Sequence, residues 1–155
     1  MPRQKIVTFL WFDTQAEEAA RFYVSIFKDS RLKRLVPGPG GTVLIVEFQL
    51  AGIDYLALNG GPQVKFNESI SLSVECADQA EVDYLWERLS EGGTKVQCGW
   101  LKDKYGLSWQ IVPSCLPEMM READPPTTKR VMDAVMKMTK LDIAALQAAY
   151  EGKSQ

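Results

Sequence analysis

The chain has 155 residues, of which 46% are hydrophobic and 25% are charged, and its formal net charge is −2. This length is typical of a single domain, and the charge gives no reason to expect nucleic acid or an anionic membrane as a partner. No apolar segment approaches the roughly 18 residues that cross a bilayer, and we expect neither a membrane span nor a secretory signal. The three cysteines are odd in number and widely spaced, which favours a reducing compartment and predicts a cytoplasmic protein.

The first half of the chain is predicted to form a strand, a helix and further strands. The apolar segment 8–12 leads into a helix over 16–27, and Thr14 and Glu17 have the spacing of a capping box at its start. Apolar and polar residues then alternate over two segments that flank an Ala-Gly turn. We therefore expect a β-hairpin, with strands over 42–50 and 53–59.

The second half repeats this order with different residues. Small polar and aliphatic residues alternate over 69–74, which predicts a strand with one face packed on a helix. Asp78 and Glu81 form a second capping box, and the helix that follows is expected over 79–89, where a pair of glycines ends it. A turn at 103–106 separates two more predicted strands, over 98–102 and 107–112.

This duplication predicts an α+β fold. Two βαβββ modules, at about 5–60 and 68–114, each expose one apolar sheet face and must pair to bury it. We expect their curved mixed sheets to surround a central cavity that holds a ligand, within a domain over 1–116. The alternation alone leaves open whether the polar strand faces lie against solvent or line the cavity, and the duplication favours the cavity.

The candidate ligand-binding residues are polar side chains on these strands, together with one flat apolar side chain that would form a wall. They are Thr8, Tyr55, Asn59, Ser69, Ser71, Gln110 and Trp100. Cys98 is either a thiol at the cavity wall or, as we prefer, a buried core cysteine, because no cationic neighbour is evident that would activate it. The segment 59–62 is either a set of ligand-facing amides or, preferably, a glycine turn.

The residues give little indication of catalytic chemistry. The chain has no histidine, which is the commonest metal ligand and general base, and it has no Cys-x-x-Cys motif, so we expect no metal site. The glycine-rich segment 37–41 has the composition of a nucleotide-binding loop. It leads into a strand rather than a helix, however, and its prolines lack amide donors, so a hairpin connector is the better interpretation.

Four segments together resemble the PhnB-like proteins, which belong to the vicinal oxygen chelate superfamily with glyoxalase I, extradiol dioxygenases and bleomycin-resistance proteins. These segments are 9–13, 16–23, 58–62 and 98–113, and the tail segments 130–134 and 141–146 also resemble the family's C-terminal extension. The resemblance covers nearly the whole chain. It implies the fold of paired modules, and it implies the family label 3-demethylubiquinone-9 3-methyltransferase.

The metal chemistry of the superfamily is not implied for this chain. By the resemblance, the metal-ligand positions fall near Thr8 (or Ile6), Tyr55, Ser69 and Gln110. Only Gln110 is a plausible ligand, and one neutral amide does not hold a divalent ion. Relatives often carry a histidine where Gln63 stands. We also find no strand, glycine turn and helix that would hold a methyl donor, so we expect no cofactor.

Two hypotheses follow from these residues. The first is a metal-free module that binds a small organic molecule. The second is an enzyme, either the methyltransferase on a ubiquinone precursor that the label names or an acid–base enzyme that uses Glu47 or Tyr55. The thermal response to S-adenosylmethionine, divalent metals and hydrophobic aromatic compounds would distinguish the two hypotheses.

The C-terminal segment 117–155 is predicted to be a helical extension, with helices over 127–138 and 141–150. Its apolar stripe needs burial. The family resemblance implies a homodimer, in which the extension would reach across to the partner chain. The alternative is an extension that folds back on its own domain. Its basic residues are expected to form a solvated helix face rather than an anion site.

Overall fold

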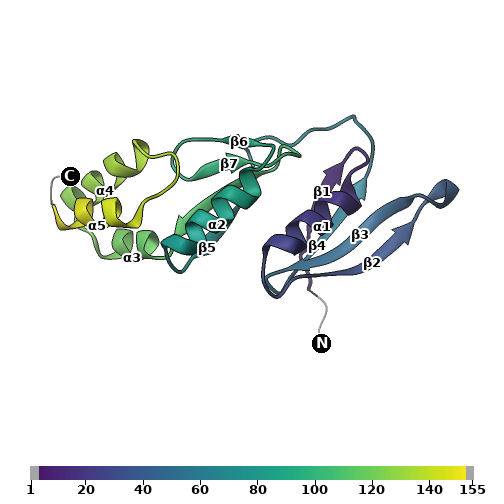
Figure 1. Cartoon of the computed structure of the whole chain (residues 1–155), viewed down its shortest axis with the longest axis horizontal. Helices are drawn as coiled ribbons and strands as arrows, with labels where there is room; N and C mark the ends of the chain where they lie inside the picture. Colours follow the sequence, from purple (N-terminus) through teal and green to yellow (C-terminus); the bar gives the residue numbers. More distant parts are fainter. Residues whose placement is uncertain (1–3, 153–155) are drawn as a thin grey trace. The chain divides into compact units, whose positions relative to one another are not determined.

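The computed structural model describes residues 4–152, and in this part of the chain five α-helices and two four-stranded sheets form an α+β fold (Figure 1). The chain divides into two compact units, of which the first ends at Phe66 and the second begins at Asn67. The first unit contains β1 (Thr8–Phe12), α1 (Ala16–Ile26), β2 (Arg31–Pro37), the 3-10 turn η1 (Pro39–Gly41), β3 (Val43–Leu50) and β4 (Ile53–Asn59). The second contains β5 (Ser71–Cys76), α2 (Gln79–Ser90), β6 (Thr94–Lys95), β7 (Trp100–Lys102), β8 (Ser108–Pro113), α3 (Cys115–Glu122), α4 (Pro125–Met136) and α5 (Ile143–Glu151).

Both units have the βαβββ order that the sequence predicts. The strand order is β1-β4-β3-β2 in the first sheet and β5-β8-β7-β6 in the second. In each sheet the first strand of the unit pairs in parallel with the last strand, and the other pairs are antiparallel. The predicted fold class, with its duplicated modules, mixed sheets and helical extension, is therefore confirmed.

Helix α1 covers one face of the first sheet because its small residues let it approach the strands closely. Ala16, Ala19 and Ala20 are fully buried, and the helix packs on β2, β3 and β4. The buried ring of Tyr23 stacks on Phe48 of β3, with ring centroids 6.5 Å apart. No described helix of this unit covers the opposite face of the sheet.

The predicted capping box at Thr14 is wrong. The residue that precedes α1 is Gln15, and it makes no side-chain cap. Instead, Asn59 Oδ1 accepts a hydrogen bond from Ala16 N at 2.8 Å. Asn59 reaches the helix start because it pairs with the last residue of β1, directly before α1. A side chain from a neighbouring strand therefore replaces the local cap.

The second helix begins and ends as the sequence predicts. Asp78 Oδ1 accepts from Glu81 N at 2.9 Å, which makes Asp78 the N-cap of α2. The Glu81 carboxylate accepts from Ala77 N rather than from the cap residue itself. At the other end, Gly93 N donates to Ser90 O at 2.8 Å after a glycine with positive φ.

Two glycine-rich segments are turns and not ligand loops. Between β2 and β3, Gly38 N donates to Thr42 O at 2.7 Å, so the predicted hairpin connector is confirmed. After β4, Gly60 N donates to Phe12 O at 2.9 Å. A Cβ atom at Gly60 would overlap the indole of Trp11, so this position requires glycine. The glycine-turn interpretation of this segment is confirmed.

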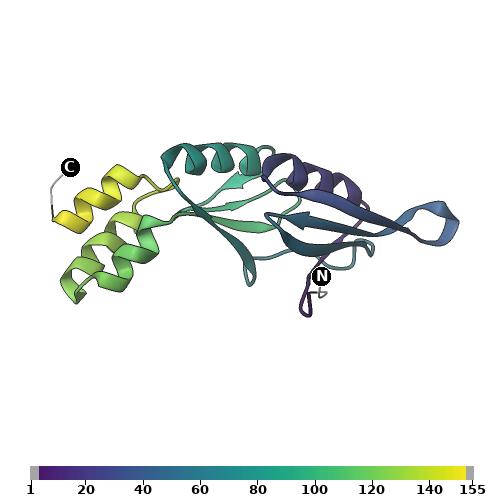
Figure 2. The ribbon, with the colours of Figure 1, turned by 90° about the horizontal axis from the view of Figure 1, so that it is seen from below.

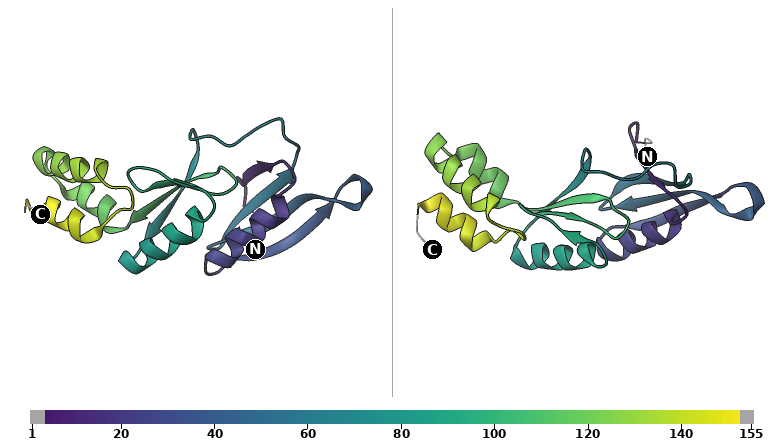
Figure 3. Two further views of the ribbon diagram at one scale, coloured as in Figure 1. Left: turned by 45° about the horizontal axis from the view of Figure 1, so that its top comes forward. Right: turned by 90° about the horizontal axis from the view of Figure 1, so that it is seen from above.

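In the second unit, α2 lies along one face of its sheet (Figure 3). The turn between β7 and β8 is organised by Asp103, which is buried. Its Oδ1 accepts from Tyr105 N at 2.9 Å and from Leu107 N at 3.1 Å, and its Oδ2 accepts from Trp109 Nε1 at 2.9 Å. One buried carboxylate therefore fixes both the turn and the central tryptophan of the sheet.

The extension contains three helices among the described residues, and α3 was not predicted (Figure 2). Helix α4 begins at Pro125, before the predicted start, because Asp124 caps it by accepting from Thr127 N at 2.9 Å. Two prolines suit the first helical turn, where amide donors have no intrahelical partner. The three helices share a core of Met119, Val131, Val135, Leu141 and Leu146.

The extension is docked on the rest of the second unit through the segment between α4 and α5. The backbone amides of Cys98 and Gly99 donate to this segment, each at 2.8 Å. The side chain of Gln79 binds the same segment twice, because Nε2 donates to Leu141 O at 3.1 Å and Oε1 accepts from Ile143 N at 2.8 Å. The side-chain amide of Gln79 thus binds one backbone carbonyl and one backbone amide at the start of α5.

Candidate functional site

The first unit contains an open cavity with a volume of about 840 Å³. Its lining residues come from β2, β3 and β4 and from the segment before β1. In the sheet, Glu47 pairs with Leu56, and Gln49 pairs with Asp54. These residues alternate along their strands with the buried side of the sheet, where Phe48 packs on α1. The polar side chains of the cavity therefore lie on the sheet face that α1 leaves uncovered, while Phe48 and Tyr55, whose rings are on the α1 side, also contribute to the lining.

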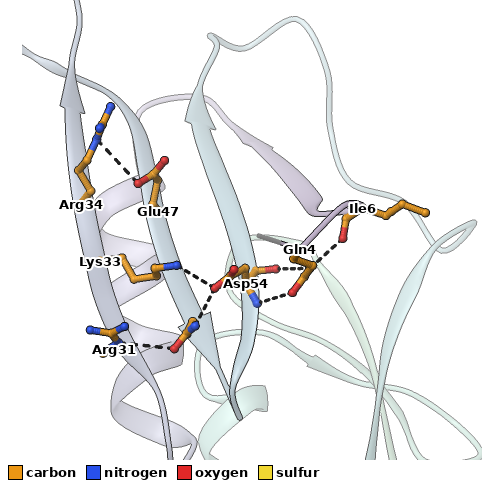
Figure 4. Close-up of polar contacts among 8 residues, drawn as sticks. Gln4, Ile6, Arg31, Lys33, Arg34, Glu47 and Asp54 are labelled. Carbon is orange, nitrogen blue, oxygen red and sulfur yellow. Dashed lines mark hydrogen bonds and ion pairs between the residues drawn. The ribbon is translucent and has the colours of Figure 1, made fainter. Parts of the chain in front are cut away.

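A polar network centred on Asp54 crosses the floor of the cavity (Figure 4). Asp54 Oδ1 accepts from Gln49 Nε2 at 2.8 Å and from Lys33 Nζ at 3.1 Å. These hydrogen bonds, first from Gln49 and then from Lys33, hold the pKa of Asp54 below its ordinary value. Gln4 binds the backbone of Asp54 on both sides, since Oε1 accepts from the amide and Nε2 donates to the carbonyl. The network ties three strands to the segment before β1.

The cavity carries a positive formal charge. Its lining includes three cations, Arg31, Lys33 and Arg34, and two carboxylates, Glu47 and Asp54, so the difference is +1. Lys33 is paired with Asp54. All three cations belong to β2, the edge strand of the sheet.

The two arginines of the cavity have few partners. Arg31 Nε donates to Gln49 Oε1 at 3.5 Å, which is at the limit of a hydrogen bond. Arg34 Nε lies 3.7 Å from Glu47 Oε2, an ion pair without a short hydrogen bond. Within residues 4–152, neither guanidinium has another hydrogen bond or ion pair, although the charge of Arg31 also helps to lower the pKa of Asp54. Both guanidinium groups therefore keep donors with which to bind an anion.

The two proposed acid–base residues are both at this cavity. Burial raises the pKa of Tyr55 above its ordinary value, so its hydroxyl stays protonated at neutral pH and does not serve as a base. Its ring stacks on Phe48, with centroids 5.5 Å apart. Glu47 is close to Arg34.

The candidate residues of the first unit lie on the α1 side of the sheet. Thr8 pairs with Tyr55, and Asn59 ends the same strand as Tyr55, so the three side chains share one face with Phe48. Only Tyr55 also lines the cavity. The amide of Asn59 is used in the fold, since Nδ2 donates to Val43 O at 3.0 Å while Oδ1 accepts from the start of α1.

Three candidate residues of the second unit are brought together on the sheet face opposite α2. Gln110 Nε2 donates to Ser71 Oγ at 2.9 Å, and Trp100 pairs with Gln110 across β7 and β8. Ser69 lies before β5, where it is exposed and its hydroxyl donates to Asn67 Oδ1. The alternation of the sequence placed Ser71 and Gln110 on polar strand faces, and the strand pairing adds Trp100 to the same face.

Ser108 occupies the same face of the second sheet. It pairs with Ser71 on one side and with Lys102 on the other. Its side chain is 1% exposed, and among the described residues its hydroxyl has no hydrogen-bond partner. A buried hydroxyl without a partner is rare in folded proteins and needs a physical explanation, such as water or a ligand.

The three cations of the first cavity and Asp54 were missed by the sequence analysis, which named only Glu47 among its charged residues. Arg31, Lys33 and Arg34 stand within four consecutive positions of one strand, and this was the available signal. Their meaning depends on Asp54 and Gln4, which are distant from them in the sequence. The pattern of one strand does not identify such partners.

The fold of the described residues is the vicinal oxygen chelate fold of glyoxalase and bleomycin-resistance domains. The sequence model of one family, described as 3-demethylubiquinone-9 3-methyltransferase, matches residues 4–112. The chain belongs to this family. The match ends in β8, so the three helices of the extension lie outside it.

Solved structures agree with this assignment. A putative 3-demethylubiquinone-9 3-methyltransferase, the PhnB protein from Bacillus cereus, is 32% identical, with a TM-score of 0.65 over 71% of this chain and 99% of that chain. Protein PA1353 from Pseudomonas aeruginosa is 19% identical, with a TM-score of 0.61 over 72% and 98% of the two chains. The fosfomycin resistance protein FosX from Mesorhizobium loti is 14% identical, with a TM-score of 0.59 over 79% and 100%. The last two show the fold alone, and no curated protein matches the chain.

The residues at the metal-ligand positions of the superfamily do not fit a divalent ion. Thr8 and Tyr55 offer neutral oxygens in the first unit, and the amide of Gln110 is bonded to Ser71 in the second. Among the described residues, no three side chains of histidine, cysteine, aspartate or glutamate are clustered as ligands.

The described helices are too short or too polar to cross a membrane.

Proposed function

We propose that the protein binds a small organic molecule in the cavity of the first unit, without a metal ion. The cavity has the volume of typical small-ligand sites, which measure roughly 300–1,000 Å³. It combines an apolar wall at Val7 and Leu56 with polar groups from three strands. Such a combination provides contact area for the body of a ligand and orientation for its polar groups.

One observation carries this proposal: the polar groups around Asp54 in the cavity are already held in place. Asp54 is fixed by Gln49, Lys33 and Gln4 through hydrogen bonds of 2.8–3.2 Å. A network with these lengths orders the side chains before a ligand arrives, which lowers the entropic cost of binding. A purely solvated strand face would not need the segment before β1 to bind the Asp54 backbone.

We also retain Ser71, Trp100 and Gln110 as candidate ligand contacts on the uncovered face of the second sheet. The hydrogen bond between Gln110 and Ser71 and the unpartnered hydroxyl of Ser108 support this part of the proposal. An indole beside hydroxyl and amide groups suits an aromatic or heterocyclic compound with polar substituents.

A cavity-blocking variant tests the proposal. In Leu56→Trp the larger side chain should fill part of the cavity, whereas Ile53→Trp adds the same bulk on the same strand at an exposed position outside it. Amide chemical shifts of the wild type should respond to a set of small aromatic and aliphatic compounds at residues of β2, β3 and β4. These responses should disappear in Leu56→Trp and persist in Ile53→Trp. Equal responses in the two variants would contradict the proposal.

S-adenosylmethionine belongs in the same compound set because the family description names a methyltransferase. We expect no response to it at the glycine turn after β4, since the amides of Gly60 and Gly61 already donate to Phe12 O and Asp13 O. A saturable response to S-adenosylmethionine would replace the binding module with the second hypothesis, an enzyme of methyl transfer.

We further propose a cytoplasmic homodimer. The free state of Cys76, Cys98 and Cys115 supports a reducing compartment. On α4, Met132 and Met136 are 39% and 63% exposed and lie one helical turn apart, so they form a small apolar strip that a second chain would cover. Light scattering should give the mass of two chains, and Met136→Lys should reduce it toward one. A wild-type mass of one chain at micromolar concentration would contradict the dimer.

A further inference from the structure

We infer that the ligand of the first-unit cavity is an organic monoanion whose carboxylate binds the guanidinium of Arg31. This inference rests on the proposed function and names the chemical class of the ligand. It follows from the way in which the charges of the cavity are paired. Lys33 is compensated by Asp54 at 3.1 Å, and Arg34 has Glu47 at 3.7 Å. Arg31 forms no ion pair within residues 4–152 and has only a longer-range electrostatic attraction to Asp54.

The contacts of Arg31 leave its anion-binding edge available. Its Nε donates to Gln49 Oε1, while the other end of the same amide, Gln49 Nε2, donates to Asp54. Gln49 is therefore oriented by Asp54, and its Oε1 lies 3.5 Å from Arg31 Nε, at the limit of a hydrogen bond. The two terminal nitrogens of the guanidinium have no described partner. Their parallel donors match the two oxygens of a carboxylate.

The rest of the cavity defines the body of the ligand. Val7 and Leu56 are half-buried and provide an apolar wall. The net formal charge of +1 is neutralised by one negative charge. A dianion would bring a second negative charge close to Asp54 and Glu47, both of which face the same cavity, and this repulsion disfavours it. These features together fit a carboxylic acid with a hydrophobic body.

Benzoate and benzamide provide a matched pair of probes, because they share shape and differ in charge. Binding is measured by amide chemical shifts during titration of the full chain. We expect benzoate to shift residues of β2 and β3 and to bind at least about tenfold more tightly than benzamide, as befits a charge-assisted bidentate contact. Phenyl phosphate, a dianion near neutral pH, should bind more weakly than benzoate.

Three variants locate the anion. Arg31→Gln should weaken benzoate binding about tenfold or more and leave benzamide unchanged. Arg121→Gln makes the same change of charge on α3 of the second unit, and it should leave both affinities at the wild-type value. Arg31→Lys keeps the charge without the planar pair of donors, so its affinity for benzoate should lie between those of Arg31→Gln and the wild type.

Several results would overturn the inference. Equal binding of benzoate and benzamide would show a cavity that binds aromatic compounds regardless of charge. The proposed function would then remain, and the inference of a monoanionic ligand would be wrong. Tighter binding of phenyl phosphate than of benzoate, or equal losses in Arg31→Gln and Arg121→Gln, would also refute it. If no amide chemical shift changes at benzoate concentrations up to about 10 mM, the inference is also refuted. The comparison of Leu56→Trp with Ile53→Trp then tests the proposed function separately.

Discussion

Replacement of Asn59 by alanine should destabilise the first unit substantially. The amide of Asn59 accepts from Ala16 N at 2.8 Å and donates to Val43 O at 3.0 Å, so the variant leaves two backbone groups without partners. Each such hydrogen bond contributes about 0.5–1.5 kcal/mol, and loss of a helix N-cap alone costs about 1 kcal/mol. We therefore expect the free energy of unfolding to fall by about 2 kcal/mol.

The matched control for this variant is Thr14→Ala. Thr14 has the spacing of a capping residue but makes no cap in the structure, so its replacement should change the free energy of unfolding by less than about 0.5 kcal/mol. Urea denaturation followed by circular dichroism measures both values. Hydrogen exchange at the first turn of α1 should accelerate only in Asn59→Ala. Equal effects of the two variants, or a change below about 0.5 kcal/mol for Asn59→Ala, would refute the reasoning.

Three further predictions concern the second unit. Gln79→Ala should free the segment between α4 and α5 at a cost of about 1–3 kcal/mol and expose it to limited proteolysis, whereas Gln147→Ala on the exposed face of α5 should not. Asp103→Ala leaves three N–H donors without the carboxylate that accepts their hydrogen bonds, and urea denaturation should show that the free energy of unfolding falls by about 3 kcal/mol or more. Burial raises the pKa of Cys76 to about 12, so its thiol should resist iodoacetamide at pH 8 in the folded protein. Because its folded pKa lies above that of the unfolded chain, its contribution to stability is complete below about pH 9 and is lost as the pH rises toward 12. Rapid labelling of Cys76, a protease-resistant Gln79→Ala or a stable Asp103→Ala would each contradict the structure.

Local sequence patterns predicted most of the fold because their physical causes are local. Alternation along the strands, the Asp78 cap and the glycine turns each depend on residues a few positions apart. The cap of α1 was missed because Asn59 lies 43 positions from Ala16. Helix α3 was missed because no cap signal marks its start, and indeed Ser114 makes no side-chain cap.

The candidate site was predictable only in part. The alternation along two strands of the second sheet placed Ser71 and Gln110 on polar faces, and the structure pairs Trp100 with Gln110 on the same face. In the first sheet the cavity depends on β2 pairing with β3 and on Gln4 folding back to Asp54. Those are tertiary contacts, which no local pattern encodes. The central cavity formed by both modules stays a prediction.

The most direct test of the proposed function is a crystal structure of the protein with the tightest-binding compound from the chemical-shift experiments. We predict ligand density against β2, β3 and β4, with the body of the compound on Leu56 and a polar group within about 2.7–3.2 Å of the Arg31 guanidinium. Density confined to any other surface of the protein, with only water beside Leu56 and Arg31, would contradict the proposed function.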